Sequence, residues 1–489
     1  MKKPFFIFAL WIFTLPMFSQ NAGDALRYSR IFYSGTARFQ GLAGAMGSVG
    51  ADYSVIATNP AGLGIYKGSE ISFTPSLWIA NSQTEYNGTT ASDNKFNFGL
   101  GNLGFVFSFS PHKNKAGGLK NLNFAFGVNR QNDFNTRIII KGQNNTSSLL
   151  TDYVNVLNSQ PGITPGQINN DYPFDIALAY NADLIYYDTS AHMYRNDAPN
   201  GGVYQQKSIK TMGSVNEFEF SFGANVNDKV YFGATIGIPY LRYYESSVYQ
   251  ETKTNDSIPY FNSLSFEQVL ETHGTGINLK VGVIYRPANW VRIGAAIHTP
   301  TYYANMRDSW SSNMYAAFED GSWNNTQFSP DGKYNYMMTT PFRAIGSLAF
   351  IIGPYGLISA EYEYVNYNQA RFYDQSQDNT IYSDVNSSIK DSYRSPVNLR
   401  IGTEWRIWDF RVRGGFGYYG SPYKNGINDG ERLLASGGFG YRGKHLFADL
   451  TYVWTRTKDQ YYLYDPTLVN SSSNTLSSSS VVMTWGVRF

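Results

Sequence analysis

The spacing Gly-x-Gly-x-x-Gly, which forms the phosphate-binding turn of many dinucleotide-binding proteins, occurs three times in the sequence. The copies start at Gly99, Gly415 and Gly438. A dinucleotide site also needs a strand before the motif, a helix after it and a distal acidic residue. All three copies lie in aromatic-rich segments with the character of strands, where glycine permits curvature and bulges. We therefore expect these glycines to shape strands and to bind no cofactor.

Residue types that support catalysis or metal binding are otherwise sparse. The chain has no cysteine, which excludes disulfides, thiolate metal sites and a cysteine nucleophile. No Gly-x-Ser-x-Gly motif is present, and the histidines show no metal-ligand spacing; they are His112, His192, His273, His298 and His445. We expect a protein that is not an enzyme and that has no metal and no cofactor.

The composition narrows the class of protein further. Of 489 residues, 42% are hydrophobic, 17% aromatic and 16% charged, and the formal net charge is +2. A soluble domain carries about a quarter charged residues, and a disordered chain is poor in aromatic residues. Nucleic-acid binding normally needs a clustered basic patch, which this charge balance does not indicate. A mean hydropathy of −0.33 argues against a helical membrane protein but is compatible with a β-barrel that has a polar lumen.

The first 20 residues have the pattern of a targeting segment. Lys2 and Lys3 precede an apolar run from Phe5 to Phe18, and small or polar residues follow. This order is typical of a secretory signal peptide. The alternative, a single transmembrane anchor, would need about 20 apolar residues. We expect cleavage close to Gln20 and export of the mature chain.

From about residue 68 the hydrophobic pattern has a period of two, which predicts β-strands. The last segment is the clearest, because Val481, Met483, Trp485, Val487 and Phe489 alternate with other residues. In a soluble β-sandwich the polar face would meet solvent. Alternation over about ten residues with Tyr and Trp at the ends is instead typical of a transmembrane β-barrel. We predict an all-β fold, a 14-stranded antiparallel transmembrane β-barrel spanning residues 68–489.

The lengths of the connections support this prediction. The fourteen strands are expected near residues 70–80, 95–110, 120–140, 207–226, 229–249, 268–286, 290–306, 337–353, 355–373, 393–406, 409–420, 432–442, 444–458 and 478–489. Connections after the even-numbered strands are short, and those after the odd-numbered strands are long. The largest loops are expected at residues 142–206 and 307–336. Short periplasmic turns alternating with long external loops are typical of outer-membrane barrels.

The C-terminus and the export pattern indicate a location in the outer membrane of a Gram-negative type of bacterium. Phe489 ends an amphipathic strand and is similar to the signal that barrel assembly machinery reads. The expected partners are therefore that machinery, outer-membrane lipid and no nucleic acid.

A barrel of this size needs something to fill it. Eight strands leave an interior that side chains just fill, whereas 16 to 18 leave an aqueous channel. Residues 21–67 are rich in Gly and Ala and do not alternate, so we predict that they form an N-terminal hatch with short helices. Charges of both signs are expected to face the lumen, where they either stiffen the barrel and anchor the plug or line a solute path. They are Glu217, Glu219, Glu361, Glu363, Asp449, Lys280, Arg292, Arg343, Arg400, Arg411 and Arg413.

Several motifs resemble those of the FadL-type long-chain fatty acid transporters. They are the stretch from Gly41 to Asp52, the sequence Asn59-Pro60-Ala61-Gly62-Leu63, and the later segments 276–287, 292–300, 398–402 and 411–422. The resemblance implies a 14-stranded barrel with an N-terminal hatch that admits hydrophobic molecules by diffusion. It also implies a kinked third strand, here within residues 123–134, that opens the wall laterally.

Two groups of residues are candidates for the site. The resemblance assigns Asn59, Pro60 and Ala61 to a hatch segment whose shift opens the path; the alternative is a turn that leads into the first strand. Five apolar residues share one face of a predicted loop helix, namely Leu149, Leu150, Tyr153, Val154 and Leu157. They would form either an external groove that captures a hydrophobic ligand or the buried face of a helix that caps the barrel.

Two functional hypotheses follow. The first is passive outer-membrane uptake of hydrophobic small molecules, foremost long-chain fatty acids, with lateral release. The second is a non-transporting barrel that serves as a structural or secretion-associated partner of exported proteins. A continuous apolar path from the loops to the hatch would favour uptake, and a solid lumen would favour the second.

Overall fold

The computed structural model describes residues 20–110, 118–160, 162–254, 258–321, 323–376, 380–424 and 426–489. Its helices are α1 (Ala22–Ser29), α2 (Ala37–Gly41), α3 (Leu149–Ser159), α4 (Pro165–Asp171), α5 (Ile176–Asn181) and α6 (Ser383–Ser392), with 3₁₀ turns η1 (Tyr53–Ala57), η2 (Pro60–Ile65) and η3 (Tyr367–Gln369). Its strands are β1 (Glu70–Tyr86), β2 (Thr89–Phe109), β3 (Leu119–Asp133), β4 (Thr136–Asn144), β5 (Ile185–Asp188), β6 (Met193–Asn196), β7 (Val203–Val226), β8 (Val230–Lys253), β9 (Phe261–Ala288), β10 (Val291–His298), β11 (Tyr302–Phe318), β12 (Asn325–Phe328), β13 (Gly332–Thr339), β14 (Arg343–Ile352), β15 (Gly356–Val365), β16 (Arg371–Asp374), β17 (Val397–Ile407), β18 (Phe410–Tyr419), β19 (Arg432–Arg442), β20 (Leu446–Tyr461) and β21 (Ser472–Arg488). The predicted signal peptide, residues 1–20, lies outside the described residues except for Gln20.

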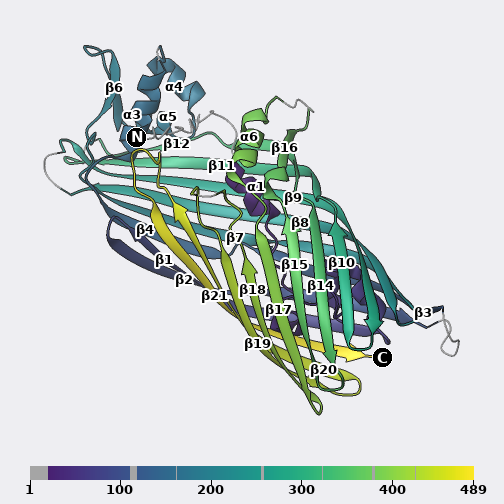
Figure 1. The fold of residues 1–489 in the computed structure, drawn as a ribbon. Helices are drawn as coiled ribbons and strands as arrows, with labels where there is room; N and C mark the ends of the chain where they lie inside the picture. Colours follow the sequence, from purple (N-terminus) through teal and green to yellow (C-terminus); the bar gives the residue numbers. More distant parts are fainter. Residues whose placement is uncertain are drawn as a thin grey trace, which may run out of the picture.

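The strands form a closed antiparallel barrel (Figure 1). Four of the fourteen wall strands are interrupted and carry two labels, β3 with β4, β10 with β11, β13 with β14, and β15 with β16. The barrel closes where β1 pairs with β21, from Glu70 opposite Arg488 to Glu85 opposite Ser473. Ser69 and Phe489 complete the seam by exchanging two backbone hydrogen bonds. The predicted 14-stranded antiparallel barrel is confirmed.

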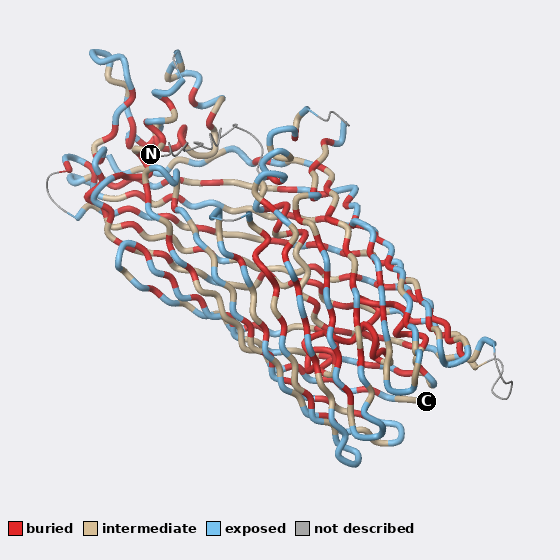
Figure 2. The backbone as a smooth tube through the Cα atoms, viewed as in Figure 1, coloured by how far each residue is buried: buried red, intermediate tan, exposed pale blue. Residues whose placement is uncertain are grey.

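The N-terminal segment lies inside the barrel, and helices from the loops lie over its wider end. In Figure 1 the purple N-terminal residues lie within the ring of strands, and α3, α4 and α5 lie at the end opposite the C-terminus. Buried backbone gathers around the N-terminal segment, whereas the turns and loop tips are exposed (Figure 2). None of the helices in the described ranges is long and apolar enough to cross a bilayer.

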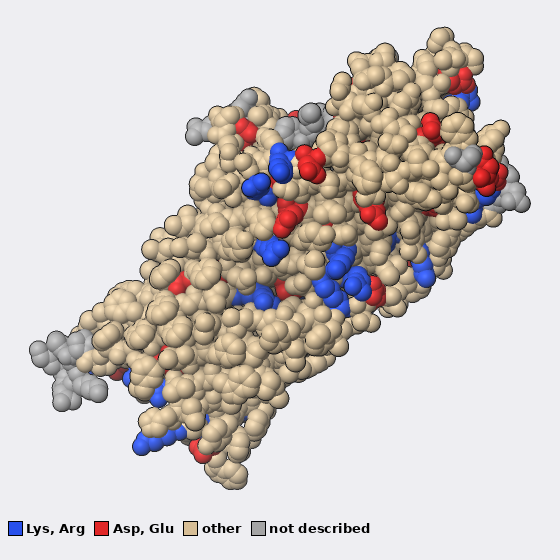
Figure 3. All heavy atoms as spheres, turned by 180° about the vertical axis from the view of Figure 1, so that it is seen from behind, with Lys and Arg blue, Asp and Glu red and all other residues tan. Residues whose placement is uncertain are grey.

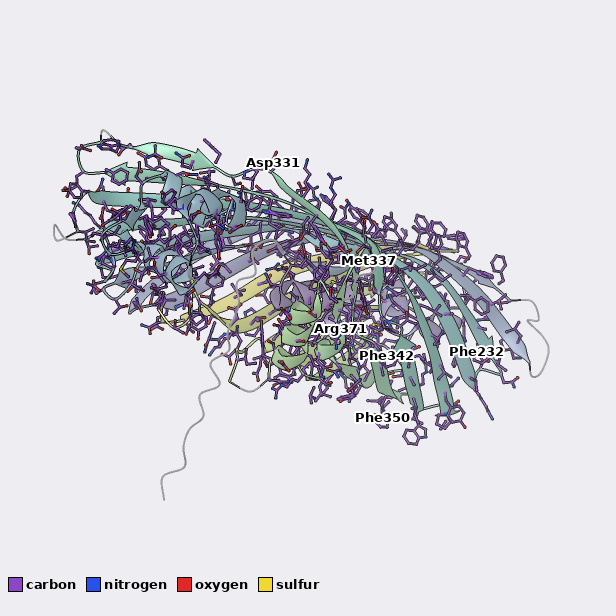
Figure 4. All side chains as sticks on the ribbon, turned by 90° about the horizontal axis from the view of Figure 1, so that it is seen from above. Phe232, Asp331, Met337, Phe342, Phe350 and Arg371 are labelled. Carbon is purple, nitrogen blue, oxygen red and sulfur yellow. The ribbon has the colours of Figure 1, made fainter. Side chains whose placement is uncertain are left out.

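An apolar belt surrounds the barrel near its periplasmic end. On β9 the outward residues from Ile277 to Tyr285 are apolar, and on β8 the outward residues from Phe232 to Tyr240 are apolar or aromatic. Figure 3 shows a broad uncharged wall over this part of the rear face, and Phe350 points away from the barrel in Figure 4. Exposed apolar side chains in a continuous band, bounded by tyrosines, are typical of a membrane-spanning wall.

Above the belt the outward residues change from apolar to polar at one level on several strands. On β1 the change lies between Ile79 and Asn81, and on β21 it lies between Val481 and Ser479. Ile79 pairs with Ser479 across the seam, so the two changes lie within two residues of each other. The long strands β7, β8 and β9 continue well beyond this level. We infer that the membrane ends there and that the upper barrel stands outside it.

Two expectations about the loops were wrong. The connection after the first strand is a two-residue turn at Asn87 and Gly88, whose φ angles of 46° and 78° suit a hairpin turn. The expected loop at 307–336 consists mostly of strand, since β11, β12 and β13 occupy most of it. In both places the polar residues face water outside the membrane, so the sequence lacks the apolar alternation that marks the belt strands.

A charge placed in the apolar belt should destabilise the barrel. Val281 faces outward on β9 in the middle of the belt, and we expect Val281→Arg to lower the free energy of unfolding by about 2–4 kcal/mol. Gln250 faces outward on β8 above the belt, so Gln250→Arg should change it by no more than about 1 kcal/mol. Denaturant unfolding in lipid vesicles measures both, and equal effects would contradict this placement of the membrane.

Candidate functional site

The hatch, residues 21–67, is held by hydrogen bonds between barrel side chains and hatch backbone. Asn123 Nδ2 donates to the Leu63 carbonyl at 2.7 Å, and Ser359 Oγ donates to the Ala45 carbonyl at 2.5 Å. Further contacts of this kind join Thr484 Oγ1 to the Ala37 amide (2.7 Å), Thr451 Oγ1 to the Ala37 carbonyl (2.6 Å), Arg292 to the Val49 carbonyl (2.6 Å) and His298 Nε2 to the Thr58 carbonyl (2.8 Å). Because buried backbone groups need partners, these bonds fix the position of the hatch in the lumen.

A buried network of charges lies on one side of the hatch. Arg400 contacts Glu361 at 2.5 Å and Glu363 at 3.1 Å, and Arg343 contacts Glu363 at 2.5 Å. Glu361 also accepts a hydrogen bond from the Gly47 amide at 2.8 Å. The network therefore balances charge inside the wall and binds the hatch backbone at the same time.

Two further groups of ion pairs join strands of the wall to one another, and one of these groups also joins the wall to the hatch. Lys280 lies between Glu217 and Glu219 on the neighbouring part of the wall. Arg413 contacts Glu404 and Asp449 at 2.6 Å each. The hatch residue Arg38 contacts Glu404 at 2.9 Å. The predicted inward charges are thus confirmed as mostly paired; Arg411, by contrast, lies at the periplasmic rim, where it donates to the Trp408 and Phe410 carbonyls.

A small cavity of about 30 Å³ lies between the hatch and the wall. Its lining contains three cationic side chains, Arg30, Lys280 and Arg343, and one carboxylate, Glu217. Four buried polar atoms of its lining residues have no hydrogen-bond partner among the described residues, namely Ser29 Oγ, Tyr33 Oη, Gln131 Oε1 and Asn278 Oδ1. The lining is both polar and apolar, and two of its cations are already paired, Lys280 with Glu217 and Glu219 and Arg343 with Glu363.

An aromatic chamber adjoins the cavity. Tyr28, Val215 and Tyr303 line the cavity and also belong to a buried apolar cluster around α1. Ala25 and Leu26 of α1 pack into this cluster, and its other members come from the wall and from α6, namely Phe134, Leu241, Tyr243, Met306, Tyr336, Met338, Val365, Tyr367, Ala370, Phe372, Tyr382, Ile389 and Tyr393. The chamber is packed with its own side chains and with α1, so an apolar space would open beside the cavity only if α1 moved away.

The wall is interrupted beside the third strand. β2 pairs with β3 only from Asn102 to Phe109, and no backbone ladder joins β2 to β4 in the described strands. A register shift lies between Arg130 and Asn132, within the segment to which the resemblance assigned the kink. β4 instead lies against the β1–β2 hairpin, where Thr84 Oγ1 donates to the Ile139 carbonyl at 2.6 Å. Residues 95–101 of β2 therefore lack a backbone partner on this side.

Comparisons with known proteins agree on the architecture. No family model matches the sequence, and no curated protein matches it. The toluene transporter TodX of P. putida matches with a TM-score of 0.55 and 13% identity, over 94% of this chain and 99% of TodX. The chain has the FadL-type fold. A Pseudomonas aeruginosa FadL homologue gives a TM-score of 0.52 at 12% identity, over 94% and 99% of the two chains. The Ralstonia pickettii toluene transporter TbuX gives 0.50 at 15%, over 92% and 97%.

In this FadL-type fold the predicted hatch residues lie together at the lower wall. Asn59 precedes η2 and accepts a hydrogen bond from the Ala61 amide, while its Nδ2 donates to the Gly47 carbonyl at 2.7 Å and to the Val283 carbonyl at 3.3 Å. Pro60 begins η2. Asn59 thus joins two hatch segments and the barrel wall.

The five apolar residues of the predicted loop helix lie in α3, and all five are buried. They belong to a cluster with wall residues such as Tyr249, Phe266 and Met314, so α3 covers the barrel mouth. Glu251 fixes the start of α3 by accepting hydrogen bonds from Ser148 Oγ at 2.5 Å and from the Leu149 amide at 2.8 Å. An external groove formed by this face would require α3 to move away from the mouth.

The cavity and chamber residues of this FadL-type fold were not predicted. Tyr28, Tyr303 and His298 come from segments far apart in the sequence, and only the closed barrel brings them together. One pattern in the sequence points to a member of this group: the alternation in β11 places Tyr303 at an inward position.

Removing Arg400 should destabilise the hatch and the wall together. We expect Arg400→Gln to lower the free energy of unfolding by about 3–5 kcal/mol, because Glu361 would lose its cation in a buried place and Glu363 would keep only Arg343. Arg411→Gln removes a charge at the rim and should change it by no more than about 1 kcal/mol. Denaturant unfolding in detergent measures both variants; a small effect of Arg400→Gln would contradict the proposed role of the network.

Proposed function

We propose that this protein mediates passive outer-membrane uptake of hydrophobic small molecules, with long-chain fatty acids as substrates. The observation that carries the proposal is the connection between the cavity and the aromatic chamber through Tyr28, Val215 and Tyr303. Ligand pockets are mostly apolar and have a few polar groups that orient the ligand. Of the cations that line the cavity, Arg30 donates to the Gly430 carbonyl and forms no ion pair with any residue that the structure describes, so it suits a carboxylate headgroup.

The interrupted wall supports lateral release. An apolar ligand gains little by entering the aqueous periplasm and gains free energy by moving into lipid. The unpaired segment of β2 carries Phe96 and Phe98, which are 65% and 71% exposed on the outer surface. We propose that a ligand passes from the chamber to the membrane through the wall beside this segment.

The hatch residues Asn59, Pro60 and Ala61 are proposed to act as the gate. Asn59 joins η2 to the Gly47 carbonyl and to the Val283 carbonyl on β9, so its loss would release two contacts at once. In addition, α1 occupies the aromatic chamber through Ala25 and Leu26. A ligand that enters the chamber therefore has to displace α1, and this would loosen the hatch from above.

The second candidate, a barrel that acts as a partner of exported proteins, is favoured by the filled lumen. The hatch occupies the lower barrel, and α3 covers the mouth. Lipid mass spectrometry on the purified protein distinguishes the two functions. A discrete bound fatty acid, altered by Asn59→Ala, supports uptake, and bulk lipid alone with stoichiometric protein partners supports the alternative.

Filling the chamber should block uptake. Val215 is buried between the chamber and the cavity, and we expect Val215→Trp to reduce uptake of labelled fatty acid by cells at least about tenfold, because the bulky ring would occupy the ligand space. Val215→Ala removes volume instead and should retain uptake, provided that both variants reach the membrane in equal amounts. Unchanged uptake by Val215→Trp would reject this route.

Linking the two sides of the wall gap should slow release. Asn97 Nδ2 contacts the Asn135 carbonyl at 3.5 Å across the gap, and the chain has no other cysteine to interfere. We expect oxidation of Asn97→Cys/Asn135→Cys to lower uptake several-fold and reductant to restore it. The matched pair Phe107→Cys/Phe124→Cys bridges β2 and β3 where they already pair, so its oxidation should have little effect. If neither disulfide affected uptake, the ligand would leave by another path.

A further inference from the structure

A row of basic side chains crosses four strands on the outer surface of the barrel, immediately above the apolar belt. Arg242 on β8 pairs directly with His273 on β9, and His273 pairs directly with Arg307 on β11. Lys333 on β13 lies beside them, opposite Ser309. We call these four residues the basic row.

All members of the basic row point away from the lumen. Their neighbours in sequence point inward; Leu241 and Tyr243 are almost fully buried, as are Thr272 and Asp308. The side chain of Arg242 is 61% exposed and that of His273 is 38% exposed. The row is therefore accessible from the membrane side of the wall and cannot act on a ligand in the lumen.

The level of the row on the barrel coincides with the outer edge of the membrane. Tyr240 on β8 and Tyr302 on β11 face outward just below it, each 42% exposed, and the belt residue Ile277 pairs with Tyr302. Tyrosines in this position mark the boundary between hydrocarbon and headgroups. Figure 3 shows charged atoms gathered midway along the rear face and an uncharged wall between them and the periplasmic turns.

Contacts with neighbouring residues orient side chains of the basic row, but they do not neutralise its positive charge. Glu271 lies beside His273 Nε2 at 2.9 Å and Arg242 at 3.6 Å, and Tyr240 Oη contacts His273 Nδ1 at 3.2 Å. Arg307 and Lys333 form no ion pair with any residue that the structure describes. The Glu271 carboxylate thus orients Arg242 and His273. Its single negative charge does not balance the positive charge of the whole row.

We propose that the basic row binds the phosphate groups of a phosphorylated glycolipid in the outer leaflet. Paired strands place Arg242 and Arg307 about 10 Å apart on either side of His273, and guanidinium groups bind phosphate oxygens through two parallel hydrogen bonds. The acyl chains of the same lipid would lie against Ile277 and the apolar side chains below it. The row thus serves as a fixed lipid site on the wall, separate from the proposed uptake route.

Native mass spectrometry of the detergent-purified full chain tests this proposal. The probes are lipid A with its phosphates and the same lipid A after enzymatic dephosphorylation. We expect Arg242→Gln/Arg307→Gln to weaken binding of phosphorylated lipid A at least about tenfold, because charge-assisted hydrogen bonds are lost. The matched control Lys229→Gln/Arg406→Gln removes two cations at the periplasmic turns and should bind like the unaltered chain.

Four outcomes would overturn the proposal. Dephosphorylated lipid A could bind equally well, or the double variant could bind like the control. Inorganic phosphate could compete at micromolar concentration, which would make the row a site for a free anion. A dimer lost in the double variant, without a change in lipid binding, would assign the row to contact between two copies of the chain. Heat-modifiable migration in gels shows whether each variant remains a folded barrel.

Discussion

A ring of fourteen strands encloses more space than its own inward side chains can fill, and this constraint governs the interior of the molecule. The space is filled by the chain's own N-terminal segment, which has little regular structure and many backbone groups to satisfy. The wall supplies the partners through short polar side chains such as Ser359 and Asn123 and through charged groups such as Glu361. The inward face of the barrel is polar because it supplies hydrogen-bond partners to the hatch backbone. The outward face is apolar because it contacts the hydrocarbon of the membrane.

The same constraint explains why the ion pairs are buried. Taking a charge out of water is costly unless it is paired and hydrogen-bonded. Arg400 meets two glutamates of the wall, and the hatch adds the ring of Tyr33 beside Arg400 and the Gly47 amide on Glu361, so part of the compensation depends on the hatch. Hatch and barrel consequently depend on each other for stability, and a movement of the hatch disturbs charges in the wall.

The sequence predicted the wall well and the site poorly. Alternation in segments such as 481–489 depends on local side-chain direction, so it reveals strands, their faces and the lumen charges. It failed above the membrane, where Asn81, Gln83 and Glu85 of β1 face water and leave no apolar face to detect. The cavity depends on Tyr28, Val215 and Tyr303 meeting across large sequence distances, and no local pattern encodes such a meeting. The loop-helix face from Leu149 to Leu157 was recognised as apolar, but only the closed fold shows what covers it.

Because several strands continue beyond the membrane, part of the barrel projects outward from the cell surface. β8 extends from Tyr240 to Lys253 above the belt, and a rise of about 3.3 Å per residue with a tilt near 40° corresponds to a height of roughly 30 Å. The covered mouth therefore stands well above the membrane surface. Large molecules that approach the cell would meet this raised part of the barrel first, whereas membrane lipid surrounds the apolar belt.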